Sequence, residues 1–306
     1  MAGAAGHISV GKDDGTHAAW RSYGREELDF QYSPSRSAHA FADTVRHWEE
    51  KSVHARTALA PITRLDVRYG KRPRQTLDWF GVADRCSRKP VHVFMHGGFW
   101  QESSKDAASF LALSHIASGH QFVAIGYTLA PNISLKGIIG EIDEAYCFVQ
   151  TNAPMLGGDP ERIIVSGHSA GAYLAASLMS RATGRADRPS AAVLISGVYD
   201  LEPICQSYVN DQLGLSPQDA TALSLATRLP PIDIPVRIVV GGDETTEFRR
   251  QSQHLFDAWR NRIADIELVI LPGRDHFDIL FDAGAAEPLV AETIGIEARE
   301  RGARSR

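Results

Sequence analysis

A short apolar run leads into a Gly-x-Ser-x-Gly pattern in the segment Arg162-Ile163-Ile164-Val165-Ser166-Gly167-His168-Ser169-Ala170-Gly171. The helix-forming residues 172–176 follow at once. This order predicts a buried strand, a sharp turn and a helix, with Ser169 exposed at the turn. The glycines on either side keep side chains from colliding with neighbouring backbone. The start of the helix directs positive dipole and free N–H groups at a reacting oxygen, so Ser169 is the candidate nucleophile.

Short apolar runs alternate with amphipathic segments on both sides of this pattern. The expected strands are 67–69, 76–80, 91–95, 121–127, 162–166, 191–195, 236–240 and 266–271, and the expected helices are 38–59, 107–118, 135–151, 170–182 and 246–261. The first two strands flank a turn, so we expect them to pair antiparallel at the start of the sheet. The rest predict βαβ units, hence an α/β protein whose mostly parallel sheet is covered on both faces. Right-handed crossovers gather the loops after the strands at one edge, where ligands bind.

Composition narrows the class of protein. The chain has 306 residues, of which 43% are hydrophobic, and a net charge of −5, which disfavours nucleic-acid or anionic-membrane partners. We expect a disordered segment at 1–19, one domain at 20–298 with a small helical insertion at 200–229, and a charged tail at 299–306. Three widely spaced cysteines without a metal-binding pattern, and no signal peptide or membrane span, predict a cytoplasmic protein with reduced thiols.

A glycine-rich loop follows the strand expected at 91–95. It reads His96-Gly97-Gly98-Phe99-Trp100. Loops at this place can turn backbone N–H groups toward an oxyanion, together with the N–H of the residue after the nucleophile. We therefore expect an oxyanion hole formed by the N–H groups of Gly98, Phe99 and Ala170, to which the resemblance described below adds Gly97. His96 is expected to brace the loop by hydrogen bonding, and Trp100 either packs beside the site or supports the loop.

The base and the acid should follow the nucleophile in the order Ser, Asp or Glu, His. Only His254 and His276 come after Ser169, and His254 falls inside an expected helix. His276 lies just past the last strand and is the candidate base. The strand at 236–240 ends in Gly241-Gly242-Asp243-Glu244, which makes Asp243 the first choice for the acid, with Glu244 and Glu247 as alternatives.

Two other carboxylates lie near enough in sequence to be candidates for the acid. Asp275 is adjacent to His276, and a neighbouring side chain does not meet the imidazole ring at the required angle, so we assign it to loop structure. Asp200 also ends a strand, but one strand too early, and is assigned to capping the insertion. The predicted catalytic set is therefore Ser169, Asp243 and His276, which needs neither a metal nor another cofactor.

With these residues placed, the sequence resembles the arylformamidase branch of the hormone-sensitive-lipase-like α/β-hydrolases. The resemblance covers residues 20–289. It rests on the loop 96–101, the segment Tyr32-Ser33-Pro34-Ser35, residues 69–70 with 74–80, Ser196-Gly197-Val198-Tyr199-Asp200-Leu201, and Asp275-His276-Phe277-Asp278. The resemblance implies the α/β-hydrolase fold with a small helical cap, the triad Ser169, Asp243 and His276, and an oxyanion loop at Gly97 to Phe99. Phe99 stands where the branch more often has tyrosine.

The resemblance implies cleavage of an amide, typically an N-formyl group on an aryl amine. The branch also contains esterases and deformylases that act on ring-cleavage products. A short-chain carboxylesterase is thus the alternative, and a ligand-binding protein on a hydrolase scaffold is a more distant one. Phe99 and Trp100 are the expected substrate contacts. The expected partner is a small-molecule substrate, and a homodimer is left open.

Overall fold

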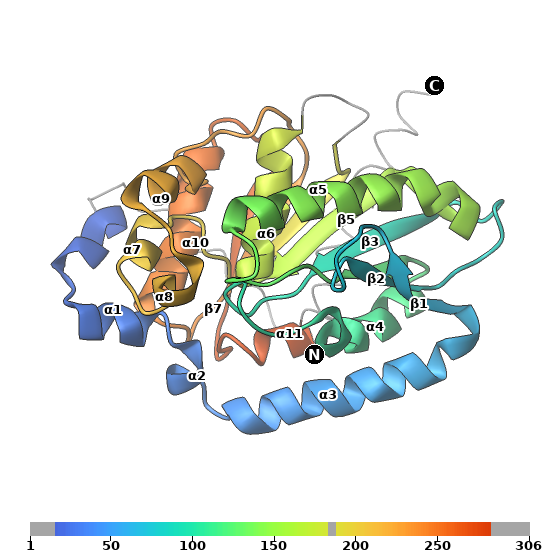
Figure 1. Cartoon of the computed structure of the whole chain (residues 1–306), viewed down its shortest axis with the longest axis horizontal. Coiled ribbons are helices and arrows are strands. Elements are labelled where there is room, and N and C mark those ends of the chain that lie inside the picture. The colour runs from blue at the N-terminus through green and yellow to red at the C-terminus, as the bar shows by residue number, and fades with distance from the viewer. Residues whose placement is uncertain (1–15, 183–187, 283–306) are drawn as a thin grey trace.

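The computed structural model describes residues 16–182 and 188–282 as a three-layered α/β fold (Figure 1). The predicted tail at 299–306 and most of the predicted disordered segment at 1–19 lie outside these residues. Residues 16–19 were expected to be disordered, but they belong to the 3-10 helix η1 (Thr16–Ser22), in which Trp20 is buried. Within the described residues, no helix is long and apolar enough to span a membrane.

Eight strands form one twisted sheet. Their bounds are β1 (Thr63–Arg68), β2 (Thr76–Phe80), β3 (Lys89–Met95), β4 (Gln121–Ile125), β5 (Gly158–His168), β6 (Ala191–Ile195), β7 (Val236–Gly241) and β8 (Ile266–Leu271). The spatial order is β1-β2-β4-β3-β5-β6-β7-β8. The first two strands pair antiparallel, β2 pairs antiparallel with β4, and all remaining pairs are parallel. The predicted fold class is therefore confirmed, and the loops that follow the parallel strands share one edge.

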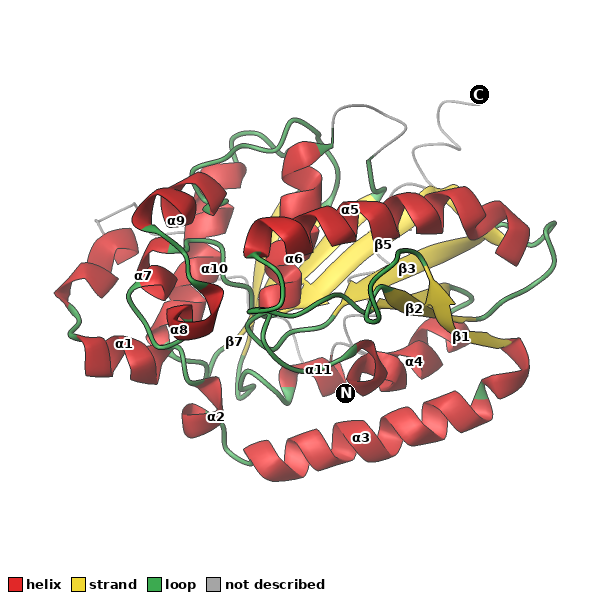
Figure 2. Ribbon diagram, viewed as in Figure 1, coloured by secondary structure: helices red, strands yellow, loops and turns green. Residues whose placement is uncertain are grey.

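The helices cover both faces of this sheet. Figure 2 shows α5 (Leu135–Asn152) and α6 (Ala170–Arg181) over one face, and α3 (Phe41–Ala58), α4 (Ala112–Ala117) and α11 (Ile279–Asp282) over the other. On the first face also lies α10 (Thr246–Trp259), whose Phe248, Leu255 and Trp259 join the core shared with α6. Burial on both faces explains why β3, β4, β6 and β7 are almost continuously apolar.

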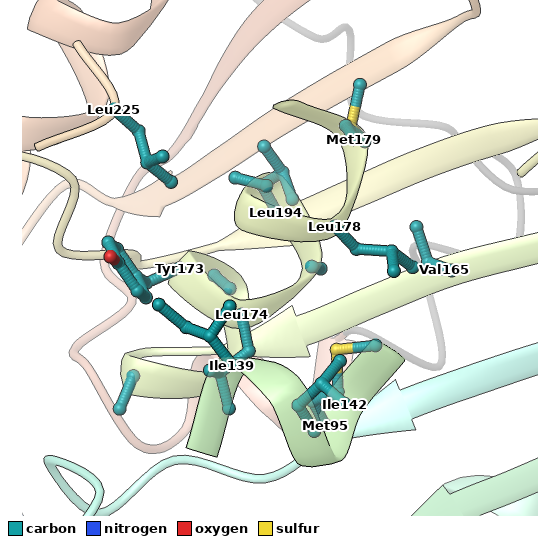
Figure 3. Close-up of a cluster of buried hydrophobic side chains, with 14 of the residues drawn as sticks. Met95, Ile139, Ile142, Val165, Tyr173, Leu174, Leu178, Met179, Leu194 and Leu225 are labelled. Atoms are coloured by element: carbon teal, nitrogen blue, oxygen red, sulfur yellow. The ribbon is translucent and has the colours of Figure 1, made fainter. Parts of the chain in front are cut away.

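The helix that follows the candidate nucleophile is held by close packing. Tyr173, Leu174, Leu178 and Met179 of α6 lie against residues of the sheet and of α5 (Figure 3). Ten consecutive residues of α6, from its first residue onward, are buried. Each large side chain buried here contributes about 1.5–3 kcal/mol. The position of the turn before α6 is therefore set by the main core and not by a mobile loop.

The predicted insertion at 200–229 contains three short helices at one end of the sheet. They are α7 (Glu202–Cys205), α8 (Asn210–Leu213) and α9 (Pro217–Leu223). The N-terminal helices α1 (Arg25–Gln31) and α2 (Pro34–Ser37) lie beside them (Figure 1). Asp200 accepts a hydrogen bond from the Glu202 N–H at the start of α7, as expected of a cap, and also pairs with Arg250 at 3.4 Å.

The largest differences from the predicted strands and helices lie in two elements. The first strand was expected at 67–69 but spans Thr63–Arg68, with an irregular register against β2. It is an exposed edge strand, so its side chains carry no clear alternation of polarity. The helix expected at 107–118 begins as the 3-10 helix η3 (Lys105–Leu111) before it continues as α4. The short 3-10 helices η2 (Ala60–Ile62) and η4 (Ala153–Leu156) complete the secondary structure.

Candidate active site

Ser169 occupies a strained turn between β5 and α6. Its backbone has φ 56° and ψ −122°, and residues with a side chain rarely adopt a positive φ. The sequence predicted an exposed serine, but the Ser169 residue is only 3% exposed. A Cβ on Gly167 would lie 2.2 Å from the backbone of Gly171, and one on Gly171 would lie 2.0 Å from the Met95 carbonyl oxygen. Both positions therefore require glycine. The Ser169 N–H donates to the Ile195 carbonyl oxygen at 2.8 Å, which ties the turn to β6.

The glycine-rich loop approaches this turn closely. A Cβ on Gly97 would lie 3.0 Å from both the Ser169 Cβ and the His168 carbonyl oxygen. Gly98, Phe99 and Trp100 all have positive φ (98°, 46° and 61°), an uncommon run that reverses the chain beside the serine. Strain of this kind persists where surrounding structure fixes it, commonly at functional sites.

Three backbone N–H groups of the loop and of the start of α6 lack a hydrogen-bond acceptor in the described part of the chain. The N–H groups of Gly98, Phe99 and Ala170 find no hydrogen-bond acceptor among the described residues. Backbone N–H groups are normally paired unless water or a ligand takes the partner's place. The expected donors of an oxyanion hole are therefore free to bind an anionic oxygen.

His96 braces the loop from behind, as predicted. Its Nδ1 donates to the Gly97 carbonyl oxygen at 2.8 Å, and its ring stacks on Tyr127 at 4.3 Å between centroids. The Tyr127 hydroxyl donates to the His96 carbonyl oxygen. Burial lowers the pKa of His96 to about 4, so the ring is neutral. Trp100 is fully buried and meets the ring of Tyr173 edge-on, the packing of a residue that supports the loop.

His276 lies after β8 and binds a carboxylate. Its Nδ1 is 2.7 Å from Oε2 of Glu244, and both side chains are buried. The other oxygen of Glu244 accepts from the Ser196 hydroxyl at 2.6 Å and from the Gly241 N–H at 2.7 Å. Three donors thus hold the carboxylate in one orientation, and the carboxylate in turn fixes which nitrogen of His276 carries its proton.

The expected pairing of Asp243 with His276 is wrong. The Asp243 side chain is 42% exposed and bonds to Nε2 of His39 at 3.0 Å instead. The chain turns after β7, with the Glu244 N–H donating to the Gly241 carbonyl oxygen and the Asp243 N–H to the Arg274 carbonyl oxygen. This turn directs residue 243 outward and residue 244 inward. Glu244 was one of the two alternatives at this position.

The remaining acidic candidates have structural partners. Glu247 is buried on α10, where it pairs with Arg250 at 2.9 Å and accepts from the Tyr32 hydroxyl at 2.6 Å. Asp275 accepts from the N–H groups of His39, Phe277 and Asp278. Burial raises the pKa of Asp275, but these three donors outweigh burial and hold the pKa below its usual value. Asp275 therefore organises its loop, as predicted.

His276 is packed by aromatic neighbours on several sides. The ring of Phe248 lies at 4.2 Å and that of His168 at 4.6 Å between centroids. No hydrogen bond joins the Ser169 hydroxyl to His276 or to any other residue that the structure describes. Such bonds are often long in a site without substrate and tighten when substrate binds. The serine, the imidazole and the loop nevertheless belong to one edge of the sheet.

Sequence reasoning missed three residues of this site. Ser196 orients Glu244, and His168 donates to the His276 carbonyl oxygen. His39 hydrogen-bonds to Asp243 through its ring and to Asp275 through its backbone N–H. Ser196 directly follows β6, so its position at the strand ends was a usable signal. His39 comes from more than 200 residues away, and nothing in its local sequence indicates this contact.

Comparison with known proteins shows the family to which the chain belongs. Residues 92–230 match the family model for the alpha/beta hydrolase fold. The kynurenine formamidase of Danio rerio is 30% identical over 273 residues, which cover 85% of this chain and 92% of that protein. The chain belongs to the arylformamidase-like branch of the α/β-hydrolases.

Other similar proteins are named for the cleavage of esters and thioesters. An isoprenylcysteine alpha-carbonyl methylesterase of Arabidopsis thaliana is 26% identical over 246 residues, covering 71% of this chain and 57% of that protein. A crystal structure of a Silicibacter protein proposed to be a thioesterase superposes with a TM-score of 0.77 at 28% identity, covering 87% of this chain and 98% of that one. The protein is thus a hydrolase that cleaves an amide or an ester bond.

Metal ligands do not gather in the described part of the chain. No group of three or more histidine, cysteine, aspartate or glutamate side chains there is arranged to hold a metal ion. Two of the buried histidines, His92 and His115, contact each other through tilted rings whose centroids are 4.1 Å apart.

Proposed function

We propose that the protein is a serine hydrolase that removes an N-formyl group from an aryl amide. The observation that carries the proposal is the geometry of His276, whose Nδ1 is held 2.7 Å from the buried Glu244 at the sheet edge that bears the strained Ser169. A base oriented by a carboxylate, at the same sheet edge as a serine hydroxyl on a sharp turn, suits nucleophilic acyl transfer. The amide and the formyl group are carried over from the relatives named kynurenine formamidase.

The proposed first step forms an acyl-enzyme. His276 takes the proton of the Ser169 hydroxyl through Nε2 while Oγ attacks the formyl carbon. The imidazolium that forms is stabilised by Glu244. The N–H groups of Gly98, Phe99 and Ala170 bind the carbonyl oxygen as it becomes negative, and each such donor typically contributes about 2.7–4 kcal/mol to the transition state.

The second half of the cycle returns the enzyme to its starting state. His276 donates its proton to the amine nitrogen as the carbon–nitrogen bond breaks, and the aryl amine leaves. A water molecule then loses a proton to His276 and attacks the formyl ester on Ser169. The products are formate and the free amine, and the proton returns to the serine. Every proton moved in the cycle passes through His276.

A substrate panel tests this proposal directly. We expect formate release from N-formylkynurenine and related N-formyl aryl amides, and a loss of at least about 10⁴-fold in kcat for Ser169→Ala. A fluorophosphonate should label the wild type and not Ser169→Ala. Formate released equally by Ser169→Ala, or a fluorophosphonate label on both proteins, would contradict the assigned nucleophile.

A short-chain carboxylesterase is the second candidate. It is favoured by the likeness to the Arabidopsis methylesterase, and the geometry of the triad does not separate an ester from an amide. Brisk turnover of p-nitrophenyl acetate without formate from any N-formyl amide would establish this alternative. A protein that fluorophosphonate fails to label and that hydrolyses neither class would be a binding protein on a hydrolase scaffold.

A further inference from the structure

The ring of His168 lies between the three segments that form the site. His168 is the residue before Ser169, so its backbone belongs to the nucleophile turn. A Cβ on Gly97 of the glycine-rich loop would lie 3.3 Å from its Nδ1. Its Nε2 is 2.7 Å from the carbonyl oxygen of His276, and the two imidazole rings are 4.6 Å apart. One side chain thus touches the elements that carry the nucleophile, the oxyanion donors and the base.

The direction of the hydrogen bond follows from the acceptor. A carbonyl oxygen cannot donate, so Nε2 of His168 must carry the proton. Among the described residues, His168 is the one donor to this carbonyl oxygen of His276. His168 is 5% exposed, and burial followed by the nearby His276 lowers its pKa well below the usual value. The ring is therefore a neutral donor with its proton on Nε2.

Neutrality matters for the neighbouring base. His276 becomes an imidazolium during acyl transfer, and a second positive charge one ring away would oppose that change. A neutral N–H donor fixes the backbone without adding charge. The Glu244 carboxylate fixes the side chain of the same residue from the other direction. The base is then held at two points, one on its main chain and one on its ring.

We propose that His168 is a positioning residue that ties the nucleophile turn to the base loop, by donating a hydrogen bond from Nε2 to the main chain of His276. It sets the distance between Ser169 and the imidazole without touching substrate. The inference rests on the proposed roles of Ser169 and His276. It applies equally to amide and ester substrates.

Two substitutions separate the donor from the bulk of the ring. In His168→Gln the amide nitrogen can still donate to the His276 carbonyl oxygen, whereas in His168→Phe an aromatic ring remains but the donor is lost. Trp48→Phe is the matched control, because Trp48 meets the His168 ring edge-on at 6.2 Å and its removal leaves the donor intact. Turnover is measured with p-nitrophenyl acetate and an N-formyl aryl amide, and folding by thermal unfolding.

We expect His168→Phe to lower kcat about 10- to 100-fold with KM changed less than about threefold, since misplacement of a base acts on the chemical step. His168→Gln should retain kcat within about fivefold, and Trp48→Phe within about threefold. The proton between His276 and Glu244 should give a downfield NMR resonance that is sharp in the wild type and His168→Gln, and broadened in His168→Phe. His276→Ala identifies that resonance.

Several results would overturn the proposal. His168→Phe with normal kcat, or His168→Gln as slow as His168→Phe when both are folded, would show that the ring only fills space. If the variants do not fold, the nitrogen-15 spectrum of the wild-type histidine rings still tests the proposed hydrogen bond. A neutral His168 with its proton on Nδ1 could not donate from Nε2 to the His276 carbonyl oxygen. A wild type that hydrolyses neither substrate and resists fluorophosphonate would refute the proposed function, while the NMR spectra would still test the contact.

Discussion

The inner and outer sides of the turn after β7 place two adjacent carboxylates in opposite environments. Glu244 points inward, is buried, and binds three donors, including Nδ1 of His276. Asp243 points outward, is 42% exposed, and binds His39 on the surface. Hydrogen bonds in the buried setting are less weakened by water than those of an exposed pair. Which of the two orients the base therefore depends on the direction of the turn and not on the residue type.

The largest expected effect is the contrast between the two carboxylates. Glu244→Gln should lower kcat/KM about 10³- to 10⁴-fold, because the imidazolium loses its counter-charge and the tautomer of His276 is no longer fixed. Asp243→Asn should stay within about threefold of the wild type. Both are measured with the same substrates at pH 7 to 8, with circular dichroism as the folding control. Equal losses of kcat/KM in the two variants would show that Glu244 does not orient the base more than Asp243 does.

The shape of the turn can be disturbed without touching either carboxylate. A Cβ on Gly241 would lie 2.2 Å from the Arg274 carbonyl oxygen, whereas one on Gly242 would meet nothing nearer than 3.3 Å. Gly241→Ala should lower the free energy of unfolding by about 2–3 kcal/mol and reduce kcat/KM at least about 10-fold. Gly242→Ala should cost less than about 1 kcal/mol. Urea denaturation and steady-state kinetics check both variants. If Gly241→Ala changes neither the free energy of unfolding nor kcat/KM, the turn can accommodate a methyl group at this position.

The inner carboxylate can also be weakened one donor at a time. Ser196→Ala removes one of the two donors to Oε1 of Glu244, and we expect kcat/KM to fall about 5- to 30-fold. Ser252→Ala is the matched control, since the Ser252 hydroxyl is buried and has no partner in the described residues. That control should keep full activity. If both variants behave alike, the Ser196 hydroxyl contributes packing and not orientation.

The smallest effect is expected on the outer side. The hydrogen bond to Asp243 raises the pKa of His39, so this contact stabilises the fold below the ordinary histidine pKa of about 6.5 and is lost as the pH rises through the raised value. His39→Ala should therefore lower Tm at about pH 6 and leave Tm unchanged at about pH 9. His54→Ala, another exposed histidine, serves as the control. A deficit in Tm that grows with pH would have the wrong sign.

Much of the fold was predictable because its elements have strong local patterns. The strands at 76–80, 191–195 and 266–271 were predicted at the bounds the structure gives them. The motif around Ser169 required a strand, a turn and a helix, and its glycines are needed because neighbouring backbone lies within 2.2 Å of any added Cβ. The edge strand β1 was misplaced because exposure on both faces removes the alternation that defines register.

By itself the sequence determined the sheet, the strained serine, the glycine-rich loop after β3 and the histidine after β8. Each depends on a few consecutive residues whose polarity and conformational freedom act locally. Only the tertiary structure decided between Asp243 and Glu244, because one residue more or less in a turn reverses the direction of a side chain. Only the tertiary structure showed that His168, Ser196 and His39 belong to the site. Their contacts join residues 48 to 236 positions apart, and no local sequence pattern predicts such contacts.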